Sequence, residues 1–253
     1  MLYLAALLVL IAIGFFVFVR WGCDWGSTQE ERGARMPGDA FLEGEPPRRV
    51  AMTRAITINA APEIVWPWLA QLGRGAGWYS IDWLDNGRKV SARHIVSWIP
   101  SPQLGDACPI GYLRRLERGQ SMIWWANEVR FAGATARLVV DIHLQAMGEQ
   151  SRLVIRNSAD ATGVMAGTAL LVFRFIDSIM AIRQLQGIRN RVECFEARSE
   201  NPETPETGAV DQYQLYEMIY ASGERAGVKG KEQAAKWRQS ALDDAVIRSN
   251  PPM

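Results

Sequence analysis

The hydrophobic positions of the first twenty residues form one unbroken block. Residues 2–19 carry no charge, and at about 1.5 Å per residue a helix of this run would be ~27 Å long. That length is close to the roughly 30 Å hydrocarbon core of a bilayer. Arg20 ends the block, and Trp21 and Trp25 follow where an interfacial aromatic belt would lie. The pattern predicts a transmembrane anchor over residues 1–20.

A secretory signal peptide is the main alternative for this block. It would need a basic segment before a shorter apolar stretch and a small-residue cleavage site after it. The sequence has neither feature, so we predict an uncleaved, single-pass membrane anchor. Arg20, Arg32 and Arg35 come after the block, and by the positive-inside tendency they place the soluble domain in the cytoplasm.

The polarity pattern changes after the apolar block. Residues 21–49 are polar and rich in turn formers, which predicts a juxtamembrane linker. Residues 53–58 are β-branched and alternating, as in a strand, and Pro62 is placed to begin a helix. Further strands separated by glycine-containing turns are predicted at 107–110, 112–117, 121–126, 135–146 and 152–158.

The longest of these strands alternates between apolar and mixed positions. Leu138, Val140 and Ile142 share the apolar face, because successive side chains of a strand point to opposite faces. We therefore predict a half-buried antiparallel strand with one wet face. The wet face is predicted to carry Arg137, Val139, Asp141, His143 and Gln145.

The next strand places an amide among apolar residues. Asn157 shares a face with Leu153 and Ile155, and a buried amide needs a hydrogen-bonding partner from the protein or from a ligand. Arg156 points the other way, like Arg137 in the preceding strand. We predict that these two arginines form surface charge pairs of small energetic value.

A long amphipathic helix follows the strands. Over residues 164–198, apolar side chains including Ile179 recur at steps of three and four residues. A curved sheet buries one face, and this helix is the expected cover, so the fold class is α+β. The folded domain is predicted over 50–199, and residues 200–253 are predicted as a polar linker with a partly helical tail.

Composition narrows the classes of function. The 253-residue chain has a net charge of +1, which argues against nucleic-acid binding. Three widely spaced cysteines and two histidines give neither a disulfide framework nor a metal-ligand spacing. No nucleotide-binding or hydrolase motif is present, and we expect no metal or other cofactor.

Four segments resemble one family in order and spacing. Residues 54–83 (beginning RAITINAAPEIVWPWLAQLG), 36–39 (MPGD), 104–106 (LGD, followed by Pro109) and 185–193 (LQGIRNRVE) are similar to the START/polyketide cyclase-like superfamily, also called SRPBCC. More narrowly, they resemble its bacterial membrane-anchored branch. The resemblance implies a helix-grip fold, in which an antiparallel sheet wraps around a long C-terminal helix and leaves a cavity between them.

Candidate ligand-binding residues come from the segments that should flank this cavity. Aromatic side chains there offer apolar surface together with a few N–H or O–H groups, although each of them would serve equally well as core filling. The aromatic candidates are Trp78, Tyr79, Trp83 and Trp124, and the remaining candidates are Leu138, Val140, Ile142, Asn157 and Ile179.

No catalytic residue can be assigned from the sequence. Asp82 and Asp85 could act as an acid/base pair, but helix capping explains them equally well. His143, on the polar face of its strand, and His94, in a basic stretch, are expected to be solvent-facing histidines.

Three functions remain open. The leading hypothesis is that a membrane-tethered domain binds an apolar small molecule or lipid. The second is an enzyme of the polyketide cyclase or dehydrase kind, and the third is a scaffold or partner-binding membrane protein. Whether the protein is an enzyme is undecided at this level, since fold resemblance does not fix function.

Overall fold

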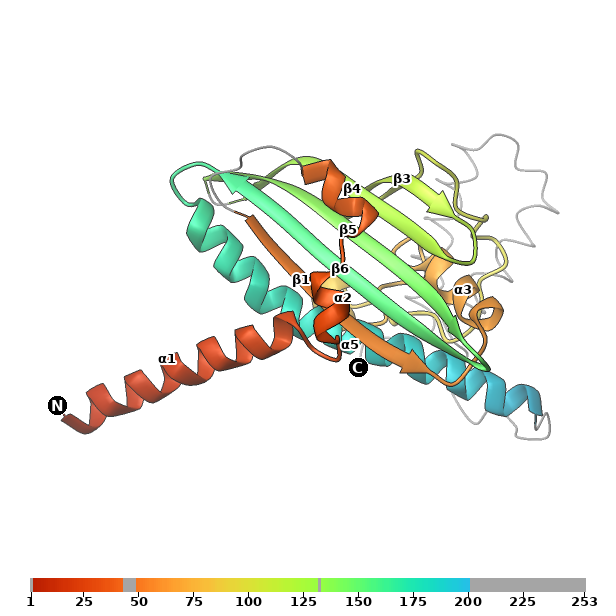
Figure 1. Cartoon of the computed structure of the whole chain (residues 1–253), viewed down its shortest axis with the longest axis horizontal. Coiled ribbons are helices and arrows are strands. Elements are labelled where there is room, and N and C mark those ends of the chain that lie inside the picture. The colour runs from red at the N-terminus through yellow and green to blue at the C-terminus, as the bar shows by residue number, and fades with distance from the viewer. Residues whose placement is uncertain (1, 43–48, 132, 201–253) are drawn as a thin grey trace, which may run out of the picture.

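A six-stranded antiparallel sheet and one long helix form the body of the protein (Figure 1). The computed structural model describes residues 2–42, 49–131 and 133–200, so the predicted tail beyond residue 200 lies outside the described residues. The sheet order is β1-β6-β5-β4-β3-β2, and the predicted α+β, helix-grip class is confirmed. The strands are β1 (Arg49–Ile58), β2 (Ala107–Cys108), β3 (Gly111–Glu117), β4 (Ser121–Phe131), β5 (Ala134–Met147) and β6 (Gln150–Thr162). The helices are α1 (Leu2–Cys23), α2 (Gln29–Gly33), the 3-10 helix η1 (Pro37–Leu42), α3 (Pro62–Gln71), α4 (Asp82–Asp85) and α5 (Ala166–Glu200).

The register of the sheet brings three side chains of neighbouring strands into one row. Trp124 of β4 is paired with Val140 of β5, and Val140 is paired with Asn157 of β6. Directly opposite residues in antiparallel strands point to the same face, and this row points toward α5. Leu138 and Ile142 lie two residues on either side of Val140 and share that face, as the alternation predicts.

Helix α5 covers this inner face, and a glycine allows its close approach. Leu185, Ile188 and Val192 of α5 are completely buried in the main hydrophobic core. A Cβ atom on Gly187 would lie only 1.9 Å from the carbonyl oxygen of Tyr79, so no other residue fits at this crossing. The predicted long amphipathic helix is thereby confirmed.

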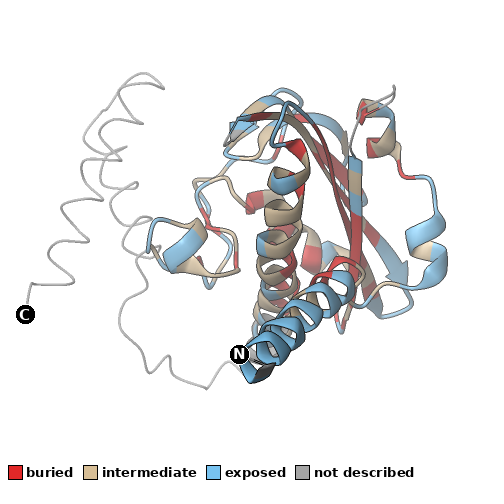
Figure 2. Cartoon of the chain, turned by 90° about the vertical axis from the view of Figure 1, so that its left-hand side faces the viewer, coloured by how far each residue is buried: buried red, intermediate tan, exposed pale blue. Residues whose placement is uncertain are grey.

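Part of the outer face of the sheet is covered as well, and the prediction of a wet face is wrong at Val139 and Asp141, although Gln145 is exposed. In the view of Figure 2, α2 and η1 lie on the side of the sheet opposite α5. Val139 is 2% exposed and Asp141 is 1% exposed. Leu42 of η1 packs on Val139, and the amide of Gly38 donates a 2.6 Å hydrogen bond to Asp141. The segment predicted as a linker therefore supplies the apolar cover and the hydrogen-bond donor that these positions need.

The same cover changes the role of one of the two outward arginines. Arg156 is 5% exposed and donates a 2.9 Å hydrogen bond to Asp39, so the prediction of a surface charge pair is wrong for Arg156. Arg137 does form a charge pair at the edge of the outer face, with Asp160. The Arg156 guanidinium also donates to the main-chain oxygens of Glu31, Arg32 and Ala34.

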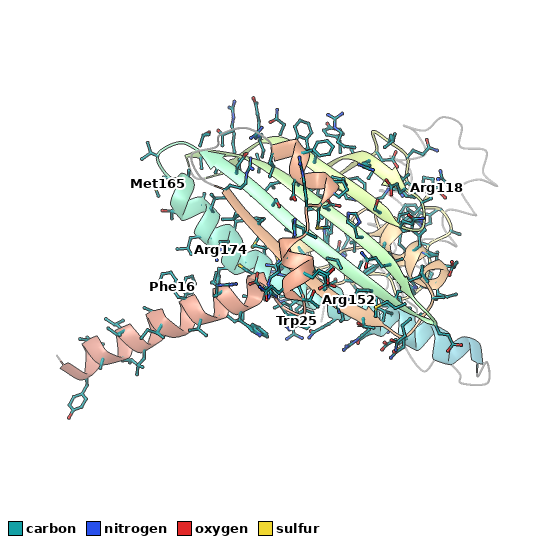
Figure 3. The ribbon with its side chains drawn as sticks, viewed as in Figure 1. Phe16, Trp25, Arg118, Arg152, Met165 and Arg174 are labelled. Atoms are coloured by element: carbon teal, nitrogen blue, oxygen red, sulfur yellow. The ribbon has the colours of Figure 1, made fainter. Side chains whose placement is uncertain are left out.

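Helix α1 projects from the body at one end and is built into it at the other (Figure 1). It is long and apolar enough to cross a membrane. Phe16 lies on the projecting part (Figure 3). Toward the C-terminal end, Val19 and Cys23 are buried, and the ring of Phe15 lies 5.0 Å from that of Phe175 on α5. The last two turns of α1 are therefore packed as part of the domain.

Candidate functional site: a cavity between the sheet and helix α5

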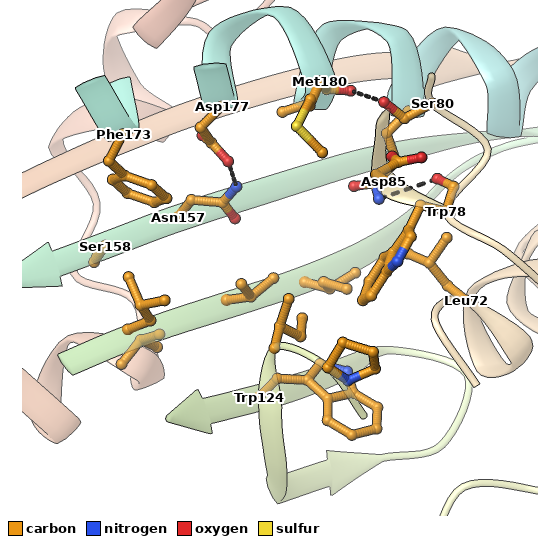
Figure 4. Close-up of a pocket in the computed structure, with 18 residues that line it drawn as sticks. Leu72, Trp78, Ser80, Asp85, Trp124, Asn157, Ser158, Phe173, Asp177 and Met180 are labelled. Carbon is orange, nitrogen blue, oxygen red and sulfur yellow. Dashed lines mark hydrogen bonds between the residues drawn. The ribbon is translucent and has the colours of Figure 1, made fainter. Parts of the chain in front are cut away.

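A cavity of about 240 Å³ lies between the inner face of the sheet and α5 (Figure 4). The row Trp124, Val140 and Asn157 contributes to its wall from three adjacent strands. The lining is mainly apolar, with a small number of polar groups, as is usual for small-molecule sites. The lining residues are Leu72, Trp78, Ser80, Asp85, Pro109, Ile110, Trp124, Leu138, Val139, Val140, Ile142, Asn157, Ser158, Phe173, Asp177, Met180, Ala181 and Gln184.

The structure brings six of the nine predicted ligand-binding residues to this cavity: Trp78, Trp124, Leu138, Val140, Ile142 and Asn157. The other three are not among its lining residues. Tyr79 is buried, and its hydroxyl accepts a 2.6 Å hydrogen bond from Gln71. Trp83 is 68% exposed on α4, and Ile179 lies on α5 outside the lining. Ligand contact by the six lining residues remains a prediction.

A buried chain of polar groups reaches the cavity wall at Asp177 and Asn157. Arg54 of β1 is 1% exposed, and its guanidinium donates a 2.6 Å hydrogen bond to Oδ2 of Asp177 on α5. The other carboxylate oxygen of Asp177 accepts a 2.8 Å hydrogen bond from Nδ2 of Asn157 (Figure 4). Arg54 also donates to the main-chain oxygen of Gly22 at 2.6 Å. Strand β1, α5, β6 and the end of α1 therefore meet in one network.

Asn157 lines the cavity and has one side-chain acceptor without a hydrogen-bond donor among the described residues. Its side chain is committed to Asp177 through the amide nitrogen, and the residue is only 8% exposed. Among the described residues, nothing donates to Oδ1 of Asn157. Such an atom is uncommon in a folded protein, because buried polar groups are nearly always hydrogen-bonded.

The two aspartates of the predicted acid/base pair have separate roles. Asp82 accepts hydrogen bonds from the amide and the hydroxyl of Ser91, so it organises the loop that follows α4. Asp85 lines the cavity, and both of its carboxyl oxygens are buried without a hydrogen-bond partner among the described residues. Burial raises the pKa of Asp85, with partial opposition from the nearby Ser80 hydroxyl.

Several cavity residues had no counterpart in the sequence-based prediction, Asp177 and Ser80 among them. Asp177 and Ser80 line the cavity, and Ser80 donates a 3.0 Å hydrogen bond to the carbonyl of Met180 (Figure 4). The signal for Asp177 is its position: an acidic residue on a helix face between Phe173 and Met180 requires a buried partner.

The histidine predicted on the polar face lies away from the cavity. Nε2 of His143 is 2.7 Å from Oδ1 of Asp141, and both residues are on the outer face of β5, opposite Val140 and Ile142. Over the described ranges, no group of three or more His, Cys, Asp and Glu side chains could hold a metal ion.

No protein-family model and no curated protein matches the chain. It is similar to the solved structure of the Zhui aromatase/cyclase from Streptomyces sp. R1128, at 9% identity over 62% of this chain and 99% of that chain, with a TM-score of 0.32. The Polyketide_cyc-like protein Cgl2372 from Corynebacterium glutamicum matches at 12% identity over 62% and 98%, also with a TM-score of 0.32. DynU16, a protein of the dynemicin biosynthetic locus, matches at 12% identity and TM-score 0.34 over 55% of this chain, which spans 46% of the DynU16 chain.

These matched structures include polyketide cyclase-like proteins, the group that the sequence motifs resemble. At such identities and TM-scores, the assignment of the helix-grip fold rests on the strand order and on the position of α5. The chemistry of the cavity has to be argued from its own residues.

Proposed function

We propose that this protein binds a hydrophobic small molecule in the cavity between the sheet and α5. The observation that carries the proposal is the lining itself, in which a wall of Trp, Leu, Val and Ile side chains holds only a few polar groups. The volume of about 240 Å³ is below the roughly 300–1,000 Å³ of pockets for drug-sized ligands. A compact molecule therefore suits the cavity better than a whole phospholipid.

Filling the cavity tests this function. In native mass spectrometry of the full chain released from detergent, the wild type should carry a co-purified small molecule. Val140→Phe, which adds a ring to the cavity wall, should lose it. Val90→Phe makes the same change at a site that is 45% exposed and should retain it. If the bound mass is absent from the wild type, or present equally in Val140→Phe, the binding proposal fails and the scaffold hypothesis replaces it.

The proposal includes a membrane tether formed by α1. The main-chain oxygen of Gly22 accepts a hydrogen bond from buried Arg54, and Val19 and Cys23 are buried in the domain. Cleavage that removed α1 would take these groups from the fold, which supports an anchor that is retained. The protein should remain in the membrane fraction after alkaline carbonate extraction, and its migration on a gel should match the full chain.

We place the domain in the cytoplasm because arginines follow the apolar block. Fusions of a cytoplasm-active and a periplasm-active reporter after residue 253 test this orientation. Only the cytoplasm-active reporter should function, and activity of the other reporter alone would reverse the assignment.

A second function is favoured by Asp85. A carboxyl group in the cavity wall whose pKa is raised by burial is a candidate to donate or accept a proton, as a cyclase-like enzyme would require. For an aromatic-precursor polyketide offered as substrate, Asp85→Asn should lower kcat by about 100-fold with little change in binding. An unchanged kcat, or no turnover by the wild type, would leave binding as the function.

A further inference from the structure

The orientation of the Asn157 amide is determined by its neighbours. Asp177 accepts from Arg54 at 2.6 Å, and a carboxylate in such an ion pair only accepts hydrogen bonds. The group of Asn157 that faces it at 2.8 Å must therefore be the NH₂ group. The amide oxygen of this cavity-lining residue (Figure 4) is left buried and without a donor among the described residues.

Arg54 is not among the lining residues of the cavity, and its guanidinium is engaged within the protein. Each of its three guanidinium nitrogens already donates: Nε to Gly22, one terminal nitrogen to Asp177 and the other to Ser178. The described lining contains no Lys, Arg or His. A ligand carboxylate or phosphate would meet the carboxyl groups of Asp85 and Asp177 without a free cation to balance it.

We propose that the ligand is a small, neutral, apolar molecule carrying a hydroxyl group, an alcohol or a phenol, which donates a hydrogen bond to Oδ1 of Asn157. This inference rests on the proposed binding function and names the chemical class of its ligand. An ether or an alkane of the same shape leaves the buried oxygen unpaired. If a water occupies that position before the ligand binds, an ether displaces it without replacing its hydrogen bond.

Asp85 provides a second polar position in the same lining. Its carboxyl oxygens are buried and lack a donor among the described residues. The oxygens of this carboxyl group can accept a hydrogen bond from a further hydroxyl of the ligand. The cavity therefore selects for donors, and it selects against anions.

Three probes of one ring system test the inference. The full chain in lipid nanodiscs is titrated with 1-naphthol, 1-methoxynaphthalene and 1-naphthoate by calorimetry, with empty nanodiscs as the blank. The wild type should bind 1-naphthol about tenfold more tightly than the ether, since a buried acceptor loses its donor in the second case. It should bind 1-naphthoate more weakly than both.

Asn157→Leu removes the acceptor at similar size and should bring the ratio of the two affinities close to one. Asn190→Leu makes the same substitution at an exposed position of α5 and should keep the wild-type ratio. The probe comparison on the wild type stands by itself if Asn157→Leu does not fold.

The outcomes separate this inference from the proposed function. Equal affinity for 1-naphthol and its ether, or preference for 1-naphthoate, overturns the hydroxyl proposal while leaving apolar binding intact. A ratio that stays at its wild-type value in folded Asn157→Leu also overturns the hydroxyl proposal. Absence of binding by all three probes overturns both.

Discussion

Arg54 donates a 2.6 Å hydrogen bond from Nε to the main-chain oxygen of Gly22, joining strand β1 to the last turn of the apolar helix α1. The same guanidinium holds Asp177, whose other oxygen orients Asn157 in the cavity wall. One buried cation is therefore shared by the proposed tether and the proposed ligand site. A Cβ on Gly22 would lie 2.6 Å from that of Ser178 on α5, so the two helices meet closely at this junction.

Removal of the buried Arg54 guanidinium should destabilise the folded protein. Arg54→Met leaves the Asp177 carboxylate buried beside an apolar side chain, and we expect the free energy of unfolding to fall by about 3–5 kcal/mol. Chemical denaturation of the full chain measures the loss. Arg115→Met is the control, since Arg115 and Glu117 form an exposed pair that contributes at most ~1 kcal/mol. Similar losses in the two variants would show that the network is not a determinant of stability.

The cover of the outer face should depend on Arg156. Its guanidinium holds the main chain at Glu31, Arg32 and Ala34, so Arg156→Met should allow the segment from α2 to η1 to open locally. Limited trypsin digestion should then cleave after Arg32 and Arg35 about tenfold faster than in the wild type, because each 1.4 kcal/mol of opening energy is a factor of ten. Mass spectrometry of the fragments identifies the cleaved bonds.

For comparison, Arg118 is exposed in the turn between β3 and β4. Arg118→Met should digest at the wild-type rate. Unchanged cleavage after Arg32 and Arg35 in Arg156→Met would mean that the cover is held by its other contacts, such as the 2.7 Å ion pair of Glu31 with Arg152.

The stability of the protein should depend on pH through Asp85. Its folded-state pKa is raised above the ordinary 3.8, chiefly by burial. The folded protein therefore holds this proton more tightly than the unfolded chain does, and its contribution is favourable below pH 3.8 and is lost as the pH rises through the folded-state pKa. Asp85→Asn should consequently gain stability relative to the wild type as the pH rises, measured by denaturation at several pH values.

Glu31 serves as the control, because its pKa is shifted in the opposite direction. Its hydrogen bonds with Arg152 lower its pKa below the ordinary 4.5, so its contribution is present above pH 4.5 and is lost as the pH falls through the folded-state pKa. Glu31→Gln should therefore lose stability relative to the wild type at neutral pH and approach it in acid. A stability difference for Asp85→Asn that does not vary with pH would show that Asp85 is not buried against the cavity in solution.

The inner half of the fold could be predicted from local pattern. Alternation along β5 identified Leu138, Val140 and Ile142 as facing α5, because a strand has a period of two. Apolar residues at steps of three and four predicted α5, because these positions share one face of a helix. The sequence also identified Asn157 as an amide among inward-facing apolar residues. It did not identify Asp177, the partner that orients this amide.

The outer half of the fold could not be predicted in this way, because it is formed by contacts between segments far apart in the sequence. The α2 and η1 segment is polar in composition, and nothing within it shows that Gly38 and Leu42 dock on Asp141 and Val139. Arg54 and Asp177 are separated by more than a hundred residues, so their pairing depends on the tertiary fold. The difference between Tyr79, which is buried, and Trp83, which is exposed, likewise follows from how the 73–91 loop lies on α5.

The most direct test of the central claim is to locate a bound apolar probe. In methyl-labelled full chain in nanodiscs, nuclear Overhauser effects from 1-naphthol should appear at the methyl groups of Leu138, Val140 and Ile142 and should saturate with probe concentration. The exposed methyl groups of Leu7 and Val9 on α1 report probe dissolved in the lipid. Effects at the three cavity residues that exceed this background are predicted, and effects confined to α1 would contradict the existence of a ligand cavity between the sheet and α5.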